Sequence, residues 1–282
     1  MPELPEVETV RLSLLAATVG RTISAVTVRD FPGVLGDAEP QAVDVALRGR
    51  SIVGIRRRGK YLLFDLDDDS TLIIHLRMTG QLTLTPHDSP RGRFEHLAIA
   101  LDSGLDLRFG DQRKFGRVIH ASREEASQLS HRLGPEPLSE QFTALCLQQR
   151  LTRRGGAIKS VLLDQRLVAG LGNIYADEAL FRARIHPLRS SSSLTPEEVR
   201  RLHRAIRVVL REGLAHRGTS ISTFRDGTGL EGQNQLNLRV YGRGRRGEPC
   251  PRCGRPLQRI VVGGRSSHFC DHCQPPDSDA TR

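Results

Sequence analysis

The stretch RLVAGLGNIYADEALFRARIHP, residues 166–187, decides how the second half of this chain is read. Apolar residues recur at helical spacing on both sides of Gly170-Leu171-Gly172-Asn173, which predicts two helical segments joined by a glycine-rich turn. Such a turn ahead of a helix presents backbone N–H groups and the positive end of the helix dipole, which favours a phosphate ligand. The alternative interpretation is an ordinary helix–turn–helix corner without a ligand.

The charge balance of the chain also favours a ligand that carries phosphate groups. The net charge is +10, most of the excess is arginine, and Arg153, Arg154 and Lys159 lie just upstream of the glycine-rich turn. This favours a polyanionic partner, with nucleic acid ranked before a membrane surface. Aromatic residues make up only 4% and tryptophan is absent, so stacking platforms for single strands are scarce and duplex recognition is favoured.

Downstream, two C-x-x-C pairs predict a metal site. Cys250 and Cys253 form the first pair, and Cys270 and Cys273 form the second. Four thiolates can close a tetrahedral structural Zn²⁺ site that leaves no position for a catalytic water. A labile disulfide pair is the alternative, and His268 and His272 are alternative ligands in the same segment; Cys146 is expected in a helical core.

The remaining sequence predicts an α+β multidomain chain. Residues 1–132 contain one helix and then many short runs that are β-branched or alternate in polarity, which predicts a helix-flanked β-sandwich. The expected domains are that sandwich (1–132), a Pro/Gly-rich linker (133–142), a helical DNA-binding domain (143–235), a β-hairpin zinc finger (236–275) and a frayed tail (276–282). No run is apolar enough to cross a bilayer and no signal peptide is recognised, which predicts a cytoplasmic, nucleoid-associated protein.

The N-terminus, MPELPEVETV, holds an unusual pair of residues. Pro5 and the acidic residues after it are typical of a helix start. Helix initiation does not explain Pro2 and Glu3. Removal of Met1 would give a free secondary amine beside a carboxylate.

Together these stretches resemble one family, the bacterial formamidopyrimidine-DNA glycosylases (Fpg, also called MutM) of the Fpg/Nei superfamily. The similarity follows the chain in order and includes PELPEVETV, RRRGKYLL, HLRMTG, DQRKFG, LGPEPLS, VAGLGNIYADEALFRARIHP, VYGR and the four-cysteine finger. The resemblance implies an N-terminal β-sandwich, a helix–two-turn–helix domain and one structural Zn²⁺ without an organic cofactor. It implies a bifunctional DNA glycosylase and AP lyase that removes formamidopyrimidines and 8-oxoguanine opposite C from double-stranded DNA as a monomer.

The resemblance also implies residue roles. Pro2 is the amine that attacks C1′, Glu3 the acid/base, Lys60 the β-elimination lysine, and Arg265 the finger arginine of δ-elimination and phosphate binding. The implied wedge in the DNA stack is Met78, Arg113 and Phe115, with Arg113 facing the orphan cytosine; the other candidate DNA-binding residues are Arg154, Lys159, Asn173, His75 and His96.

The chain departs from the family pattern in three places. Arg77 and Thr79 stand where many members have Gly and Ser, and Phe94 stands where a histidine is frequent. In the loop that caps the lesion, Gln233 and Asn234 replace an aromatic pair.

Two alternative functions remain open from the sequence. One is a Nei-type glycosylase for oxidised pyrimidines, against which PELPE and the Arg-x-Phe pattern at 113–115 argue. The other is a non-catalytic damage-binding protein, against which the intact Pro2, Glu3, Lys60 and Arg265 argue.

Overall fold

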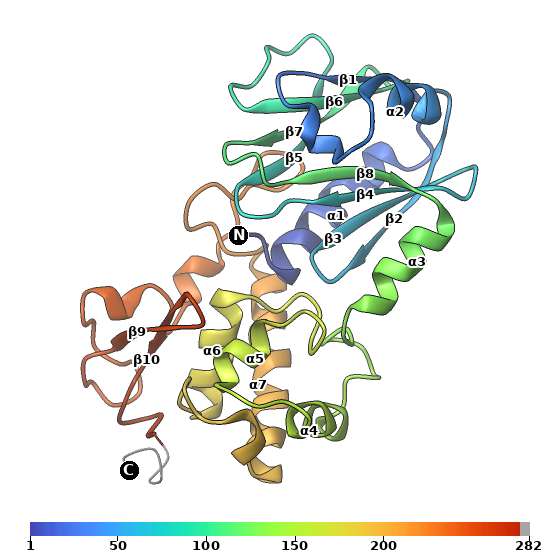
Figure 1. Cartoon of the computed structure of the whole chain (residues 1–282). Helices are drawn as coiled ribbons and strands as arrows, with labels where there is room; N and C mark the ends of the chain where they lie inside the picture. The colour runs from blue at the N-terminus through green and yellow to red at the C-terminus, as the bar shows by residue number, and fades with distance from the viewer. Residues whose placement is uncertain (277–282) are drawn as a thin grey trace. The chain divides into compact units, whose positions relative to one another are not determined.

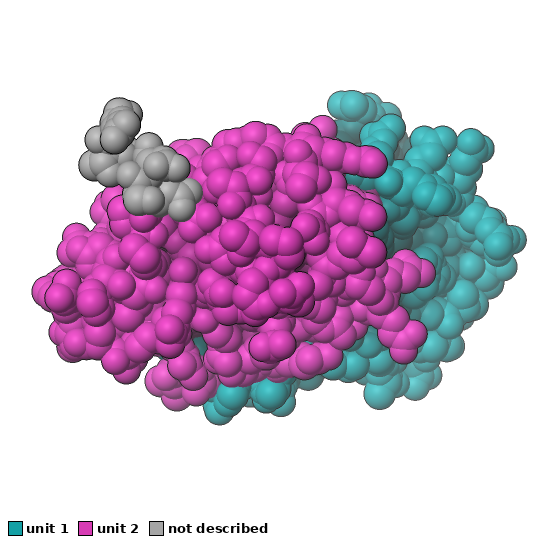
Figure 2. Space-filling view, turned by 90° about the horizontal axis from the view of Figure 1, so that it is seen from below, with its two compact units in different colours: residues 1–132, 214–235 teal, residues 133–213, 236–282 magenta. Residues whose placement is uncertain are grey.

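The computed structural model describes residues 1–276 and divides into two compact units. Unit 1 comprises Met1–Arg132 and Leu214–Gln235, and unit 2 comprises Leu133–Gly213 and the chain from Leu236 onward (Figure 2). The expected tail falls almost wholly on residues 277–282, which lie outside the described residues. Among the described residues, none of the helices is long and apolar enough to span a membrane.

Unit 1 is built on two four-stranded sheets (Figure 1). One has the strand order β1-β6-β7-β5 and the other β2-β3-β4-β8. All neighbouring strands are antiparallel. The strands are β1 (Ile23–Val28), β2 (Ile52–Arg58), β3 (Tyr61–Leu66), β4 (Thr71–His75), β5 (Gly80–Pro86), β6 (Glu95–Leu101), β7 (Leu105–Asp111) and β8 (Arg117–Ala121).

Both sheets and helix α1 (Leu4–Thr18) contribute side chains to one hydrophobic core. Phe64 of β3 and Phe109 of β7 come from different sheets, and both are fully buried in this core. From α1, Val10 and Leu14 enter the same core. Because burial of apolar side chains is the main favourable term in folding, this core fixes α1, and with it the start of the chain, on the sandwich.

The segment 214–235 belongs to unit 1, although the sequence places it with the helical domain. Its Gly227 N–H donates to Ser13 Oγ of α1 at 2.9 Å, and its carbonyl accepts the N–H of Leu84 at 2.8 Å. Leu84 lies on β5, an edge strand, so the loop pairs with the side of the strand that faces away from the sheet. A Cβ on Gly227 would lie 2.5 Å from Leu14, so only glycine allows this close approach.

Unit 2 is mainly helical and ends in a two-stranded hairpin (Figure 1). Its longest helix, α7, starts with a reciprocal capping box: Glu198 N–H donates to Thr195 Oγ1 at 3.2 Å, and Thr195 N–H donates to Glu198 Oε2 at 2.9 Å. The elements are α4 (Ala144–Thr152), α5 (Ile158–Leu163), α6 (Asn173–Ala183), α7 (Pro196–Ala215), β9 (Gln258–Val262) and β10 (Arg265–Phe269), with 3₁₀ turns at Ser191–Ser193 and Arg243–Arg245. A further 3₁₀ turn, Asn234–Asn237, begins in unit 1 and ends in unit 2.

The sequence predicts most of these elements but misses or misplaces some. Helices α2 (Pro40–Leu47) and α3 (Arg123–Arg132), and the 3₁₀ turn Pro32–Leu35, interrupt a region that was predicted to hold only strands after α1. The helical segment predicted just before Gly170 is wrong in extent, because the helix there, α5, ends at Leu163 and the residues that follow form turns. Asp164 ends it, because its carboxylate accepts the backbone N–H of Arg166 in a tight turn.

A partly buried ion-pair network holds α1 to the β2–β3 hairpin and gives a test of the fold. Burial alone would raise the pKa of Glu8, but hydrogen bonding from Arg11 and the charge of Arg57 hold that pKa below its usual value of 4.5. A carboxyl group whose pKa is lowered by folding stabilises the fold above its unfolded pKa, and this contribution disappears as the pH falls.

We expect the free energy of unfolding to fall as the pH drops below 4.5, and Glu8→Gln to reduce the steepness of this fall. At neutral pH the same substitution should cost about 1 kcal/mol, because it removes charged hydrogen bonds. Urea unfolding at a series of pH values measures both effects. An unchanged pH dependence in the variant would show that Glu8 does not carry this contribution.

Candidate active site and nucleic-acid interface

The predicted nucleophile and acid lie at the start of α1 in unit 1. Pro2 and Glu3 are both buried, and the exposed Met1 precedes them. Glu3 is the N-cap of α1, and its backbone N–H donates to Glu6 Oε2 at 2.8 Å. The core side chains of α1 and this hydrogen bond together hold the first residues of the chain in place.

The predicted elimination lysine is in the same unit. Lys60 lies in the two-residue turn between β2 and β3 and is only 6% exposed. Arg57 braces this turn from inside unit 1, because its Nη1 donates to the Gly59 carbonyl at 3.0 Å and its Nε donates to Glu8 of α1 at 2.9 Å. The Glu8–Arg57 pair therefore connects the helix that follows Pro2 and Glu3 to the turn that carries Lys60.

His75, predicted to contact DNA, is a buried neutral side chain beside this turn. Burial, together with the charges of Arg77 and Lys60, lowers its pKa to about 3. Its ring meets Tyr61 edge-on at 4.5 Å between centroids, and its Nδ1 accepts the backbone N–H of Arg77 at 2.9 Å. These contacts are those of a packing residue, so direct DNA contact by His75 stays a prediction that the geometry does not favour.

The three residues of the predicted wedge come together in the structure. Arg113 Nη1 lies 3.0 Å from Met78 Sδ, and its guanidinium carbon lies 4.8 Å from the centre of the Phe115 ring. Phe115 is 48% exposed, which is high for a phenylalanine. The two turns that carry these residues, after β4 and after β7, thus present one exposed apolar and cationic cluster.

Asp111, which the sequence analysis did not single out, organises this cluster. It is 1% exposed, and its carboxylate accepts the backbone N–H groups of Arg113, Phe115 and Gly116 at 3.1, 2.8 and 2.7 Å. Thr79 Oγ1 also donates to it, so the chain's Thr-for-Ser departure keeps the hydroxyl that joins the two turns. The aspartate at the end of a strand, followed by a short cationic turn, is the signal that could have identified it.

The structure also shows the surroundings of Arg77 and Phe94, two departures from the family pattern, and of the nearby His96. Arg77 has φ +53°, a left-handed conformation in which the glycine of many family members meets no steric penalty. His96 is 4% exposed and its Nε2 lies 2.9 Å from the Asp111 carbonyl, so it supports the wedge turn from behind. Its predicted contact with DNA is therefore not favoured by its position. Phe94 is partly exposed and lies against Arg93.

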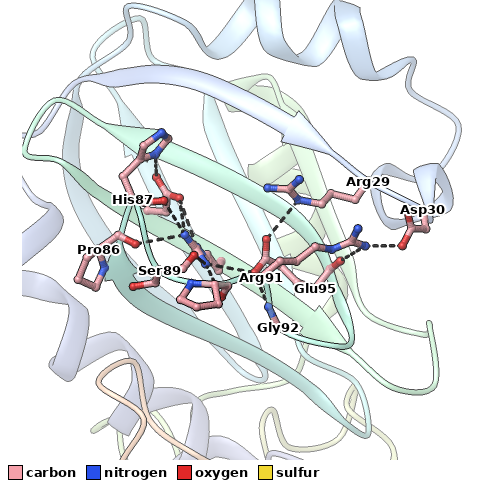
Figure 3. Close-up of polar contacts among 11 residues, drawn as sticks. Arg29, Asp30, Pro86, His87, Ser89, Arg91, Gly92 and Glu95 are labelled. Carbon is pink, nitrogen blue, oxygen red and sulfur yellow. Dashed lines mark hydrogen bonds and ion pairs between the residues drawn. The ribbon is translucent and has the colours of Figure 1, made fainter.

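A second polar cluster in unit 1 is structural. The Arg108 guanidinium donates to four backbone carbonyls of the β5–β6 loop, at residues 86, 87, 89 and 90, over 2.9–3.2 Å. Asp106 and Glu95 neutralise its charge (Figure 3 shows the contacts around Glu95 and the loop). Because this guanidinium is almost fully enclosed and hydrogen-bonded to the protein itself, the cluster shapes the loop and offers no free group for chemistry.

In unit 2, the predicted phosphate-binding residues surround the start of α6. Asn173 is the first residue of α6, and its Nδ2 donates to the Ser266 carbonyl of β10 at 3.0 Å. Lys159 Nζ donates to the Asn173 carbonyl at 3.0 Å and to Asp177 Oδ1 at 2.5 Å. Lys159 is 0% exposed, whereas a phosphate contact needs an accessible ammonium, so its direct contact with DNA stays a prediction that this geometry does not favour.

Asp177 is the residue of this region that the sequence analysis missed. Besides Lys159, it accepts Ser267 Oγ and the His268 backbone N–H, both at 2.9 Å. Burial raises the pKa of this carboxyl to about 6, although the lysine and the other donors counteract the shift. Asp177 therefore joins α5, α6 and the hairpin strand that begins at Arg265.

Arg265 is exposed at the first position of β10. The preceding turn, Gly263-Gly264, has positive φ at both residues, which is the geometry of a tight hairpin. A Cβ on Gly263 would lie 2.6 Å from Ser160 Oγ of α5, so the hairpin tip rests on the helix that carries Lys159. Arg154, by contrast, forms an ion pair with Asp164 and is about one-third exposed.

The four predicted cysteines meet in one cluster. One sulfur atom from each of Cys250, Cys253, Cys270 and Cys273 lies within 4.8 Å of all the others. Without a metal ion, burial and the neighbouring sulfur atoms raise the pKa of Cys273 to about 12. A bound divalent cation stabilises the thiolate form and so lowers the cost of deprotonating these cysteines. The cluster fits one structural Zn²⁺ with four sulfur ligands and no open position.

Comparison with known proteins agrees with this geometry. Residues 1–118 match the formamidopyrimidine-DNA glycosylase N-terminal domain, residues 133–225 match the formamidopyrimidine-DNA glycosylase H2TH domain, and residues 247–276 match the zinc finger found in FPG and IleRS. The formamidopyrimidine-DNA glycosylase of Herpetosiphon aurantiacus is 50% identical, covering 97% of this chain and 100% of that protein. The one from Chloroflexus aurantiacus is 48% identical, covering 97% and 98%.

Solved structures give the same result. The crystal structure of the MutM (Fpg) protein from Thermus thermophilus has a TM-score of 0.87 at 44% identity, covering 98% of this chain and 100% of that one. A Lactococcus lactis Fpg variant in complex with Fapy-dG-containing DNA has a TM-score of 0.91 at 39% identity, covering 97% and 100%.

The fold and the clustered residues define the class of this protein, a base-excision repair DNA glycosylase with AP lyase activity. The chain belongs to the formamidopyrimidine-DNA glycosylase family, whose members act on oxidised purines, and the Nei-type alternative is not favoured.

The zinc cluster gives a prediction with an internal control. We expect one equivalent of zinc per chain, and we expect Cys253→Ser to abolish it because three thiolates cannot close the tetrahedron. Cys146→Ser should leave the zinc content unchanged, since Cys146 is the one cysteine outside the cluster. Elemental analysis of the purified chains measures the metal. Zinc retained by the Cys253 variant would contradict the four-cysteine assignment.

The Lys159–Asp177 pair predicts an asymmetry between single and double variants. Asp177→Ala should destabilise the fold by about 3–5 kcal/mol, because it leaves a buried ammonium without a counter-charge. The double variant Lys159→Met, Asp177→Leu should cost less than Asp177→Ala alone, because no charge remains buried. Urea unfolding of the three chains measures the difference, and a double variant at least as unstable as Asp177→Ala would rule out this account.

Proposed function

We propose that this chain excises oxidised purines, including formamidopyrimidines and 8-oxoguanine opposite C, from duplex DNA with the Pro2 amine as nucleophile. The observation that carries the proposal is the placement of Pro2 and Glu3 at the buried start of α1, in the same unit as Lys60 and the exposed wedge cluster. Pro2 acquires a free secondary amine only when Met1 has been removed. The Lactococcus lactis relatives were solved with DNA containing an abasic site or Fapy-dG, which supports the proposed partner.

The proposed chemistry begins at C1′ of the damaged nucleotide. The Pro2 nitrogen forms a bond to C1′ while the glycosidic bond breaks, and the base leaves with that electron pair. The bonded nitrogen then gives up its N–H proton to the departing base, which leaves a lone pair on the nitrogen. Opening of the sugar ring then breaks the C1′–O4′ bond, and O4′ takes a proton from Glu3. The nitrogen lone pair forms the C1′=N⁺ bond of an iminium, which is cationic without any protonation because Pro2 is a secondary amine.

Elimination follows from the electron demand of this iminium. It acidifies the C2′ proton, whose removal we assign to the amine of Lys60, and the electron pair expels the 3′ phosphate. Loss of the C4′ proton then sends a second electron pair through the same conjugated system and expels the 5′ phosphate, a step we assign to Arg265. Arg265 is exposed and carries three or more donors suited to phosphate oxygens, whereas the buried Lys159 supports this region from inside.

The wedge cluster supplies the step before chemistry. Extruding a nucleotide from a duplex costs a few kcal/mol in lost stacking and pairing. Met78 and Phe115 offer apolar surface that can fill the gap in the stack, and Arg113 offers donors to the unpaired cytosine. Asp111 holds the turn with three backbone hydrogen bonds, so little conformational entropy is lost when the wedge enters the DNA.

Borohydride trapping tests the proposed nucleophile, because borohydride reduces the iminium to a stable amine. We expect wild-type chain to form a covalent complex with a duplex that contains one formamidopyrimidine opposite cytosine, and the linked peptide to begin at Pro2. Pro2→Gly keeps a primary amine but lacks the pre-organised ring, so trapping should slow by about ten-fold or more.

The same assay on other duplexes separates the alternatives. Trapping on an oxidised pyrimidine but not on an oxidised purine would make the chain Nei-like in specificity. Tight binding without trapping on any lesion or abasic site would make it a damage-binding protein. Attachment at a lysine with Pro2 unmodified would move the nucleophile away from the N-terminus.

A further inference from the structure

The buried carboxylate of Glu6 holds two distant segments of unit 1 at once. It is 1% exposed, and its Oε2 accepts the Glu3 backbone N–H at 2.8 Å. Its Oε1 accepts the backbone N–H of Thr219 at 2.7 Å. Thr219 lies in the loop 218–235, more than two hundred residues away in sequence, so one side chain joins the N-terminal segment to this loop.

The contact with Glu3 bears directly on Pro2. A peptide unit is planar, so the Pro2–Glu3 peptide moves as one plane that includes the Pro2 Cα. Fixing the Glu3 N–H on Glu6 therefore fixes that plane and limits the directions in which the Pro2 nitrogen can point. A nucleophile held in one direction reacts faster than one that samples many.

The stem of the loop 218–235 is closed by hydrogen bonds between its first and last residues. Asn234 is 3% exposed, and its Nδ2 donates to Thr219 Oγ1 at 2.8 Å while its backbone N–H donates to the Gly218 carbonyl at 3.0 Å. Gln235 Oε1 accepts the Ser220 N–H at 2.9 Å. The amide side chains of positions 234 and 235 thus tie the end of the loop to its beginning.

Two glycines permit this stem to lie so close to Glu6. Gly218 has φ +82°, and a Cβ there would lie 3.0 Å from Glu6 Cγ. A Cβ on Gly232 would lie 2.2 Å from the Gly218 carbonyl oxygen. A side chain at either position would push the loop stem away from the Glu6 carboxylate, so the close packing requires glycine at both positions.

We propose that Glu6 is a positioning residue that couples the loop 218–235 to the N-terminal amine, through Thr219 and Asn234, so that the closed stem holds Pro2 ready to attack. The proposal rests on the proposed function of Pro2. It predicts that a change in the loop stem slows iminium formation even on DNA that has no base for the loop to touch.

The test compares Asn234→Leu with the matched substitution Asn237→Leu, at an exposed asparagine three residues further along. The substrate is a duplex with a preformed abasic site, and the readouts are the single-turnover borohydride-trapping rate and the dissociation constant for an uncleavable tetrahydrofuran analogue. We expect Asn234→Leu to slow trapping about ten-fold with binding changed less than two-fold, and Asn237→Leu to change neither. A partly unfolded chain would lose binding and rate together.

Two more variants protect the test against a folding failure at Asn234. Thr219→Val keeps the shape and the backbone N–H but removes Oγ1, and Glu6→Gln removes the charge and one acceptor. Both should slow trapping, and Thr219→Val combined with Asn234→Leu should slow it no more than either alone.

The outcomes separate this inference from the proposed function. Slowing of base excision on the lesion duplex, with normal trapping on the abasic duplex, would overturn the coupling and confine the loop to base contact. Additive effects of Thr219→Val and Asn234→Leu would overturn the chain of contacts. Absence of trapping at Pro2 in the wild-type chain would instead refute the proposed function.

Discussion

The first residue of a chain is bonded to a neighbouring residue on one side only. A terminal amine therefore keeps one orientation only if the residues that follow it are fixed. Here the fixed element is α1, whose apolar face enters the core of the sandwich. Glu8 then joins α1 to the turn that carries Lys60 through Arg57. Burial of one helix thus positions both ends of the proposed reaction, the amine that attacks and the lysine that assists elimination.

The same division between working side chains and supporting carboxylates recurs elsewhere. Asp111 is buried and holds the turn that exposes Arg113 and Phe115. Asp177 is buried and holds the hairpin that exposes Arg265. In each case an acidic group accepts backbone N–H or hydroxyl donors from the segment that we propose contacts DNA. The chain has a high net positive charge, but two buried acidic residues hold in place the segments that expose Arg113 and Arg265.

Helix α1 and the zinc cluster were predictable from the sequence because residues close together in the chain specify them. Pro5 and the acidic first turn define α1, and the two C-x-x-C pairs bring four sulfurs together. The supporting residues were not predictable, since Asp111 and Asp177 act through partners that only the folded chain brings near. Helix α3 was missed although Ser122 and Glu125 form a capping box at its start, because the strand pattern that precedes it outweighed that signal. Burial of Lys159 likewise follows from tertiary packing and has no sequence signature.

Helix α6 places Asn173, Asp177 and Phe181 four residues apart, so all three lie on one face. Asn173 and Asp177 bond to the hairpin strand β10, and Phe181 packs with Cys250 and Cys270 in the core of the zinc finger. Each residue of a helix is rotated by about 100° from the one before it. Insertion of a single residue early in α6 would turn this stripe away and break its contacts with the hairpin and with the metal module together. The contacts between α6 and the zinc finger therefore depend on the spacing of these three residues along the helix. A single substitution removes one contact, whereas a change in helix length removes all of them.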